Sequence, residues 1–181
     1  MSSSIYNVQS WQNNNIYKMN DIVTNADGTF YYYAKQDHTS HASQTFNETL
    51  TTYPTLWDGV ENDNVYGIQR QSFFWKPSYS SNTEITPAVK RIQFGGGYEQ
   101  RVQDGINSIL LQINLRFDER DSDETTAIIH FFQSKRGVDS FLYVPAPPYN
   151  AQGRYVCRSW SLATNFYGNN TITAKFDQVT Q

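Results

Sequence analysis

The most constraining feature of this sequence is a run in which apolar and polar residues alternate. From 111 to 117 the chain reads LQINLRF, with an apolar residue at every odd position and Gln, Asn or Arg between them. Successive side chains of a β-strand point to opposite faces, so this run predicts a strand with one buried face and one polar face. The fold must therefore contain a sheet that is covered on one side.

A helix is predicted directly after this strand. Asp121 can cap its N-terminus, and Glu124 is placed three residues later to complete a capping box. Apolar residues follow at helical spacing, and Gly137 stands where a glycine commonly ends a helix. We expect residues 122–136 to form one packed helix.

The remaining regular structure is predicted to be strands. Asp27-Gly28 lies between two β-forming runs, which is typical of a hairpin. Further strands are predicted at 85–94, 98–102, 141–144, 154–161 and 171–179. The polar stretch 36–52 has no helical period and is interpreted as an ordered loop or surface strand. The order of strands, one helix and strands predicts a mainly β fold, a small sheet or barrel with one packed helix.

The charge is unevenly distributed along the chain, which indicates two modules. Residues 1–69 have 2 Lys and 7 acidic residues, whereas residues 70–181 have 12 Lys or Arg and 10 acidic residues. We predict a small all-β module at 4–59, a linker at 60–72 and a larger domain at 73–181.

Composition argues against several classes of function. The net charge of -3 gives no basic field for nucleic acid. No apolar run is long enough to span a bilayer, and the N-terminus lacks the regions of a signal peptide. We therefore expect a protein that is made in a cytoplasm, does not recognise nucleic acid and does not insert into a membrane.

No set of residues predicts a catalytic or metal site. His38 and His41 are three residues apart in a polar stretch, but a metal site normally needs three or four ligands, so loop hydrogen bonding is the better interpretation. His130 is assigned to the helix, and Cys157 to a structural position in a strand. The acidic run at 118–124 lacks the spacing of a calcium loop and fits a helix N-terminus. We predict no enzymatic activity, no metal and no cofactor.

The stretch RIQFGGGYEQR, residues 91–101, contains three consecutive glycines. A phosphate-binding loop would need Lys-Ser/Thr after the glycines and a helix next, and neither is present. The run is better explained as a tight turn whose glycines adopt positive φ. Its alternative role is a contact between subunits, made by Arg91, Tyr98 and Arg101, because Arg and Tyr are favoured at interfaces.

Aromatic residues of the first module allow two interpretations. Sugar rings stack on exposed aromatic faces, and the candidates for such a surface are Trp11, Tyr17, Tyr32 and Trp57. A module of fewer than 60 residues also needs large side chains for its own core. Both interpretations stay open from the sequence.

Residues 73–181 resemble the minor tail protein M family of long-tailed bacteriophages. The motifs that carry the resemblance occur in the family's order: Phe74-Trp75; Pro87, Val89, Lys90 and Arg91; Phe94-Gly95-Gly96-Gly97-Tyr98-Glu99-Gln100-Arg101; Gly105-Ile106-Asn107; Gly137; Ser140-Phe141-Leu142-Tyr143; Pro147-Pro148-Tyr149; Val156, Trp160 and Ser161; and Ala174-Lys175-Phe176-Asp177-Gln178-Val179. Gly96 stands where the family often has Asp. The first module resembles small carbohydrate-binding-like modules, of the chitin-binding type, that recur in phage tail proteins. The matching residues are Trp11, Tyr17, Asp21-Ile22-Val23, Tyr31 to Ala34, His38-Thr39-Ser40, Phe46 and Trp57.

This resemblance implies a structural protein of the virion tail tip or baseplate, assembled in the host cytoplasm. The implied fold is a tail-tube-like β-barrel or sandwich with one flanking helix. The implied assembly is a ring of six copies between the tail tube protein and the distal hub, with Pro147, Pro148 and Tyr149 as further interface candidates. The alternative is a glycan-binding adsorption protein whose first module contacts host-surface polysaccharide.

Overall fold

A computed structural model describes most of the chain, in segments. The described residues are 8–25, 28, 30–59, 62–63, 68–69, 72–78, 81–94 and 96–180. Most of the predicted linker at 60–72 lies outside them; within it, Asn62–Asp63 (β7) pairs with Ile68–Gln69 (β8).

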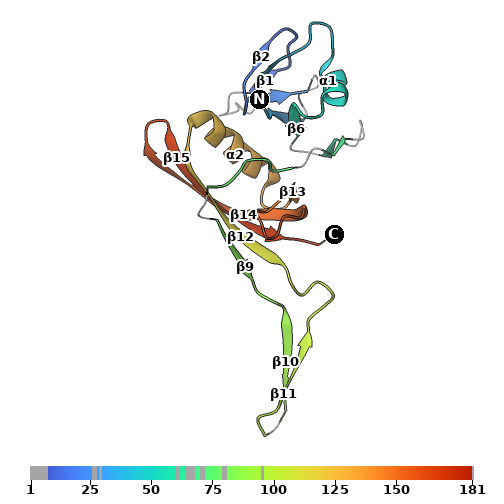
Figure 1. The fold of residues 1–181 in the computed structure, drawn as a ribbon, viewed down its shortest axis with the longest axis vertical. Coiled ribbons are helices and arrows are strands. Elements are labelled where there is room, and N and C mark those ends of the chain that lie inside the picture. The colour runs from blue at the N-terminus through green and yellow to red at the C-terminus, as the bar shows by residue number, and fades with distance from the viewer. Residues whose placement is uncertain are drawn as a thin grey trace.

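The larger domain is built on one five-stranded antiparallel sheet. Its strands, in spatial order, are β13 (Phe141–Tyr143), β14 (Gly153–Phe166), β15 (Asn169–Gln178), β12 (Leu111–Arg120) and β9 (Asn82–Ile85). The sheet is curved, and helix α2 lies along one face (Figure 1). The prediction of a mainly β fold with a packed helix is confirmed, with the sheet as an open half-barrel and not a closed barrel.

Helix α2, Ser122–Lys135, follows β12 as predicted. The Asp121 carboxylate accepts a hydrogen bond from the backbone N–H of Glu124 at 2.7 Å, so the N-cap is confirmed. The expected reciprocal half of the capping box is wrong, because the Glu124 carboxylate accepts from Arg120 Nη1 at 2.9 Å instead. The helix ends with Arg136 and Gly137 in the left-handed region, at φ 54° and 69°.

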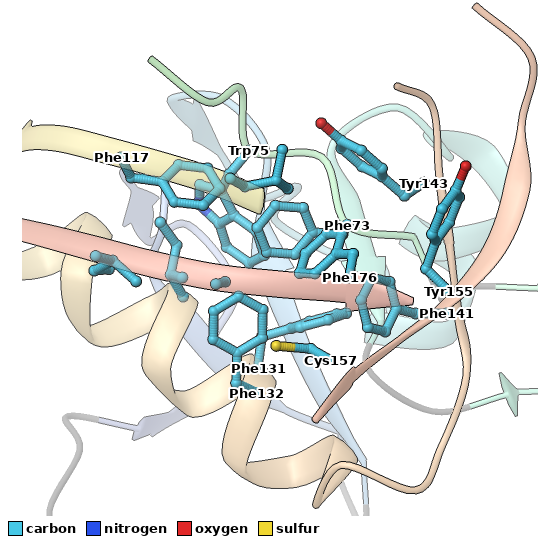
Figure 2. Close-up of a cluster of buried hydrophobic side chains, with 14 of the residues drawn as sticks. Phe73, Trp75, Phe117, Phe131, Phe132, Phe141, Tyr143, Tyr155, Cys157 and Phe176 are labelled. Carbon is cyan, nitrogen blue, oxygen red and sulfur yellow. The ribbon is translucent and has the colours of Figure 1, made fainter. Parts of the chain in front are cut away.

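Aromatic side chains fill the space between α2 and the sheet (Figure 2). Phe73, from the segment that precedes β9, lies at the centre of this cluster. Its ring stacks on Phe132 of α2 at 5.5 Å and meets the edge of Phe176 of β15 at 5.1 Å. The alternating run in β12 contributes the buried side chains of Ile113, Leu115 and Phe117, which confirms the predicted core face.

The first module contains a second, smaller sheet. Its strands, in spatial order, are β1 (Val8–Ser10), β3 (Ile22–Thr24), β4 (Tyr31–Ala34) and β6 (Trp57–Gly59), and β2 (Ile16–Tyr17) pairs separately with β5 (His38–Thr39). Strands β3 and β4 are antiparallel, and the turn between them is closed by a 3.0 Å bond from Gly28 N to Asn25 O. The predicted hairpin is confirmed.

The first module is not all β, because residues Phe46–Thr52 form helix α1. This corrects the interpretation of 36–52 as a loop or surface strand. Thr45 and Glu48 form a complete capping box, with the Glu48 carboxylate accepting from Thr45 N at 2.8 Å. A helix of seven residues is too short to show a hydrophobic period, so this capping pair was the signal available in the sequence.

Strand β4 joins the two modules because its side chains alternate between two cores. Tyr32 and Ala34 pack in the core of the first module, whereas Tyr33 belongs to the aromatic cluster of the larger domain. Ile22 of the neighbouring strand β3 lies in that same cluster. The first module is therefore fixed on the larger domain by shared apolar packing.

Candidate functional site

A two-stranded hairpin projects from the end of the larger domain (Figure 1). Its strands are β10 (Val89–Gln93) and β11 (Glu99–Gln103), which form a separate two-stranded sheet beyond the pair β9 and β12. In the turn, Gly96 and Gly97 have φ of 83° and 86°, a conformation that other residues adopt only with strain. The predicted glycine turn with positive φ is confirmed at these two residues, and Gly95 lies outside the described ones.

The register of the hairpin gives it two different faces. Side chains alternate along each strand, so paired residues share a face. The first, named the cationic face, carries Val89, Arg91, Gln93, Glu99, Arg101 and Gln103. The second, named the apolar face, carries Lys90, Ile92, Phe94, Tyr98, Gln100 and Val102. Three of the predicted interface residues thus lie on one hairpin, with Arg91 and Arg101 on one side and Tyr98 on the other.

Two arginines lie directly opposite each other on the cationic face. Arg91 is the cross-strand partner of Arg101, and like charges in this position destabilise a strand pair. Arg101 forms an ion pair with Glu99 on its own strand. Arg91 has no ion-pair partner within the described part of the chain, so its charge is available to another molecule.

Within the described part of the chain, nothing buries the two strands of the hairpin. Every residue of β10 and β11 is exposed, and Tyr98 and Phe94 retain 77% and 54% of their accessible surface. A lone two-stranded hairpin is at best marginally stable in water, and grouped exposed apolar side chains mark interaction sites. The arrangement is suited to binding another protein surface.

The second set of predicted interface residues lies elsewhere, in the loop between β13 and β14. Pro147, Pro148 and Tyr149 are exposed there. The start of this loop borders a mainly apolar groove of about 800 Å³, whose other wall is residues 72–78. The hairpin and this loop are separate surfaces of the molecule (Figure 1).

Three of the four predicted glycan-facing rings are core residues, which corrects their assignment. Tyr17, Tyr32 and Trp57 are at most 1% exposed, and α1 packs Phe46 and Leu50 against them. Their ring faces are covered, so no sugar can stack on them.

Trp11 is the fourth predicted glycan-facing residue and keeps part of its surface exposed. It stacks on Tyr17 at 5.4 Å, and its Nε1 donates to Asn13 Oδ1 at 3.1 Å.

The histidines hold structural positions. His38 Nδ1 lies 2.9 Å from the carbonyl oxygen of Gln36, and His41 Nδ1 accepts from Ser43 N at 3.2 Å. His130 is buried in α2, where burial lowers its pKa to about 4. Among the described residues, no three acidic, histidine or cysteine side chains are grouped as metal ligands would be, and neither helix has the length and apolarity to cross a bilayer.

The similarity to known proteins that the following comparisons show covers the larger domain. Residues 71–180 match the family model described as phage minor tail protein. Tail tip protein M of Escherichia phage lambda is 29% identical over 110 residues, which cover 60% of this chain and 97% of that protein.

Two solved structures of gene transfer agent particles are also similar. One is the tail of an empty particle, described as a helical refinement with C6 symmetry, and the other is a native virion. Each has 13% identity and a TM-score of 0.43; they cover 58% and 59% of this chain and 79% and 82% of the matched chains.

Proposed function

This chain belongs to the phage minor tail protein family and is a structural, non-enzymatic component of a virion tail. We propose that it forms a ring that joins the tail tube to the distal hub. The ring is proposed to contain six copies. The observation that carries this proposal is the hairpin, whose exposed residues form one charged and one apolar face with no partner in the described chain.

The exposed side chains of the apolar face favour contact with a neighbouring protein. Ile92, Phe94, Tyr98 and Val102 each retain 39% or more of their surface. Burying apolar surface contributes roughly 25 cal/mol per Å², so an assembly that covers this face is stabilised by it. A neighbour in the assembly would also support the hairpin, whose strands are exposed in the described part of the chain.

The open sheet edge supports the same proposal. β9 pairs with β12 on one side and has no strand on its other side among the described residues. β13, at the opposite edge, is partly covered by Ser72 and Phe73 of its own chain. Exposed strand edges favour pairing with another chain, and a closed ring removes them.

Tail assembly with a shortened hairpin tests this role. Residues 89–103 are replaced by a two-residue Asn-Gly turn, and the variant is supplied to a phage that lacks the native gene. We expect a folded protein that is absent from purified virions, together with tails that lack a tip in electron micrographs. Normal incorporation of the shortened variant, or absence of the native protein from purified virions, would overturn the proposal. Symmetry in images of intact tails gives the copy number.

A further inference from the structure

We propose that the cationic face of the hairpin binds an acidic surface on a second copy of this chain, in a head-to-tail contact. The acidic surface, named the acidic turn, is residues 118–123, which comprise the last three residues of β12, the helix cap Asp121 and the first two residues of α2. This inference rests on the proposed function, since it names the partner of the same hairpin. Its basis is the charge and position of these two surfaces.

Two carboxylates of the acidic turn have no ion-pair partner among the residues that the structure describes. Asp118 is paired with Arg116 at 2.7 Å, and Glu124, just beyond the turn, is paired with Arg120 at 2.9 Å. Glu119 and Asp123 are exposed and have no ion-pair partner in the described part of the chain. They are the counterpart of Arg91, which is similarly unpaired on the hairpin.

Backbone geometry at Glu119 indicates that its side chain is displayed. The pairing of β12 with β15 is interrupted between Phe117 and Arg120 by a bulge, and Glu119 has φ of 56° there. Bulges redirect side chains out of the regular alternation, and a non-glycine residue in this region costs roughly 1 kcal/mol or more. A glycine would adopt this positive φ without strain. The glutamate therefore contributes its carboxylate, at the cost of backbone strain.

The two surfaces lie too far apart to meet within one chain. Strand β12 begins at Leu111, on the side of the hairpin, and its last residues, up to Arg120, belong to the acidic turn at its other end (Figure 1). Its ten residues span roughly 33 Å, and the hairpin extends in the opposite direction. The contact must therefore be between copies. Because it joins different surfaces, it is a heterologous contact, which gives a ring where the rotation between successive copies closes and an open filament where it does not.

Charge exchange between two variants tests this contact with the full-length protein. When all copies carry Arg91→Glu, the new Glu of one copy faces Glu119 of the next. When all copies carry Glu119→Arg, Arg91 of one copy faces the new Arg of the next. Each variant alone is expected to associate at least about tenfold more weakly than the native protein in sedimentation velocity, because like charges at an interface repel. A 1:1 mixture restores complementary charges at both contacts, so we expect association to return to near the native level and to weaken as salt is raised.

Two further variants control for folding and for net charge. Glu119→Gly removes the carboxylate and relieves the backbone, so it is expected to weaken association without lowering the melting temperature. Lys18→Glu makes the same charge change as Arg91→Glu on an exposed position of the first module and should leave association unchanged.

A monomeric native protein at all concentrations, unaltered association of the single variants, or no recovery in the mixture would overturn this contact. If the exchange fails but the shortened-hairpin variant is still excluded from tails, the role in the tail stands and only the partner of the cationic face is wrong.

Discussion

The hydroxyl of Tyr33 lies 2.5 Å from Nδ1 of His130, and this hydrogen bond connects the two modules. Tyr33 belongs to β4 of the first module and His130 to α2 of the larger domain. Both residues are buried, at 1% and 7% exposure. A second polar contact, from Trp75 Nε1 to Asn20 Oδ1 at 2.8 Å, lies in the same interface. The first module is thus held in one orientation on α2, so an assembled tail would present it at a fixed place.

Removing the Tyr33 hydroxyl should destabilise the whole protein. Tyr33→Phe keeps the ring but deletes a hydrogen bond to a buried group, which costs about 1–3 kcal/mol. Tyr31→Phe is the matched control, because the Tyr31 ring packs on His130 at 4.7 Å and, among the described residues, its hydroxyl forms no hydrogen bond between the modules. In urea unfolding, the free energy of unfolding should be lower for Tyr33→Phe and unchanged for Tyr31→Phe. Equal stability of the two variants would contradict a role for this bond.

Stability should fall as the solution becomes acidic, partly through His130. Burial lowers its pKa in the folded protein to about 4, whereas an unfolded histidine titrates near 6.5. The unfolded chain therefore gains a proton first, so the free energy of unfolding decreases between about pH 6.5 and pH 4 by at most about 3 kcal/mol. Above pH 6.5 this contribution is fully present. The free energy of unfolding, plotted against pH, should differ in slope between the native protein and His130→Gln only within this window. Parallel plots would show that His130 does not cause the pH dependence.

A side chain at position 97 should loosen the hairpin without unfolding the domain. Gly97 has φ of 86°, and space around it is open, so Gly97→Ala is opposed by backbone strain of roughly 1–2 kcal/mol and not by a clash. Hydrogen exchange should accelerate at the amides of β10 and β11 and remain unchanged in β12 and β15. Gly97→Asn, a residue that tolerates this region better, should show a smaller effect. Unaltered exchange in Gly97→Ala would contradict the proposed requirement for glycine.

The single cysteine should be unreactive in the folded protein. Cys157 is 1% exposed, and burial raises the pKa of its thiol to about 12. The thiolate is the reacting form, so labelling at pH 8 should be about a thousandfold slower than for a free cysteine. Full labelling is expected in urea, and Cys157→Ser gives the blank. Rapid labelling of the native protein would show that this strand opens.

Much of the larger domain could be predicted because its signals are local. The alternating run placed Ile113, Leu115 and Phe117 in the core, and the Asp121 cap located the start of α2. Both depend on residues a few positions apart, whose spacing reports which face is buried. The missed helix α1 shows the limit, since seven residues give a capping pair but no period.

The sequence left Tyr17, Tyr32 and Trp57 open between a core and a glycan-facing surface, for a different reason. A tyrosine or tryptophan is equally suited to a core and to a sugar-facing surface, so residue type does not distinguish them. Their burial depends on Phe46 and Leu50 of α1, which cover them from another part of the chain. Amino-acid composition does not show which segments of the chain pack over these rings.

Patterns among neighbouring residues were therefore sufficient to predict most strands of the larger domain, α2 and the glycine turn, although the strand predicted at 85–94 is divided between β9 and β10. Long-range packing settled the rest. It brings Tyr33 to His130 across 97 positions, sends Arg91 and Tyr98 to opposite faces, and leaves the hairpin uncovered. Whether a side chain is buried or free to bind depends on which distant segments pack against it, and that information is absent from any short stretch of sequence.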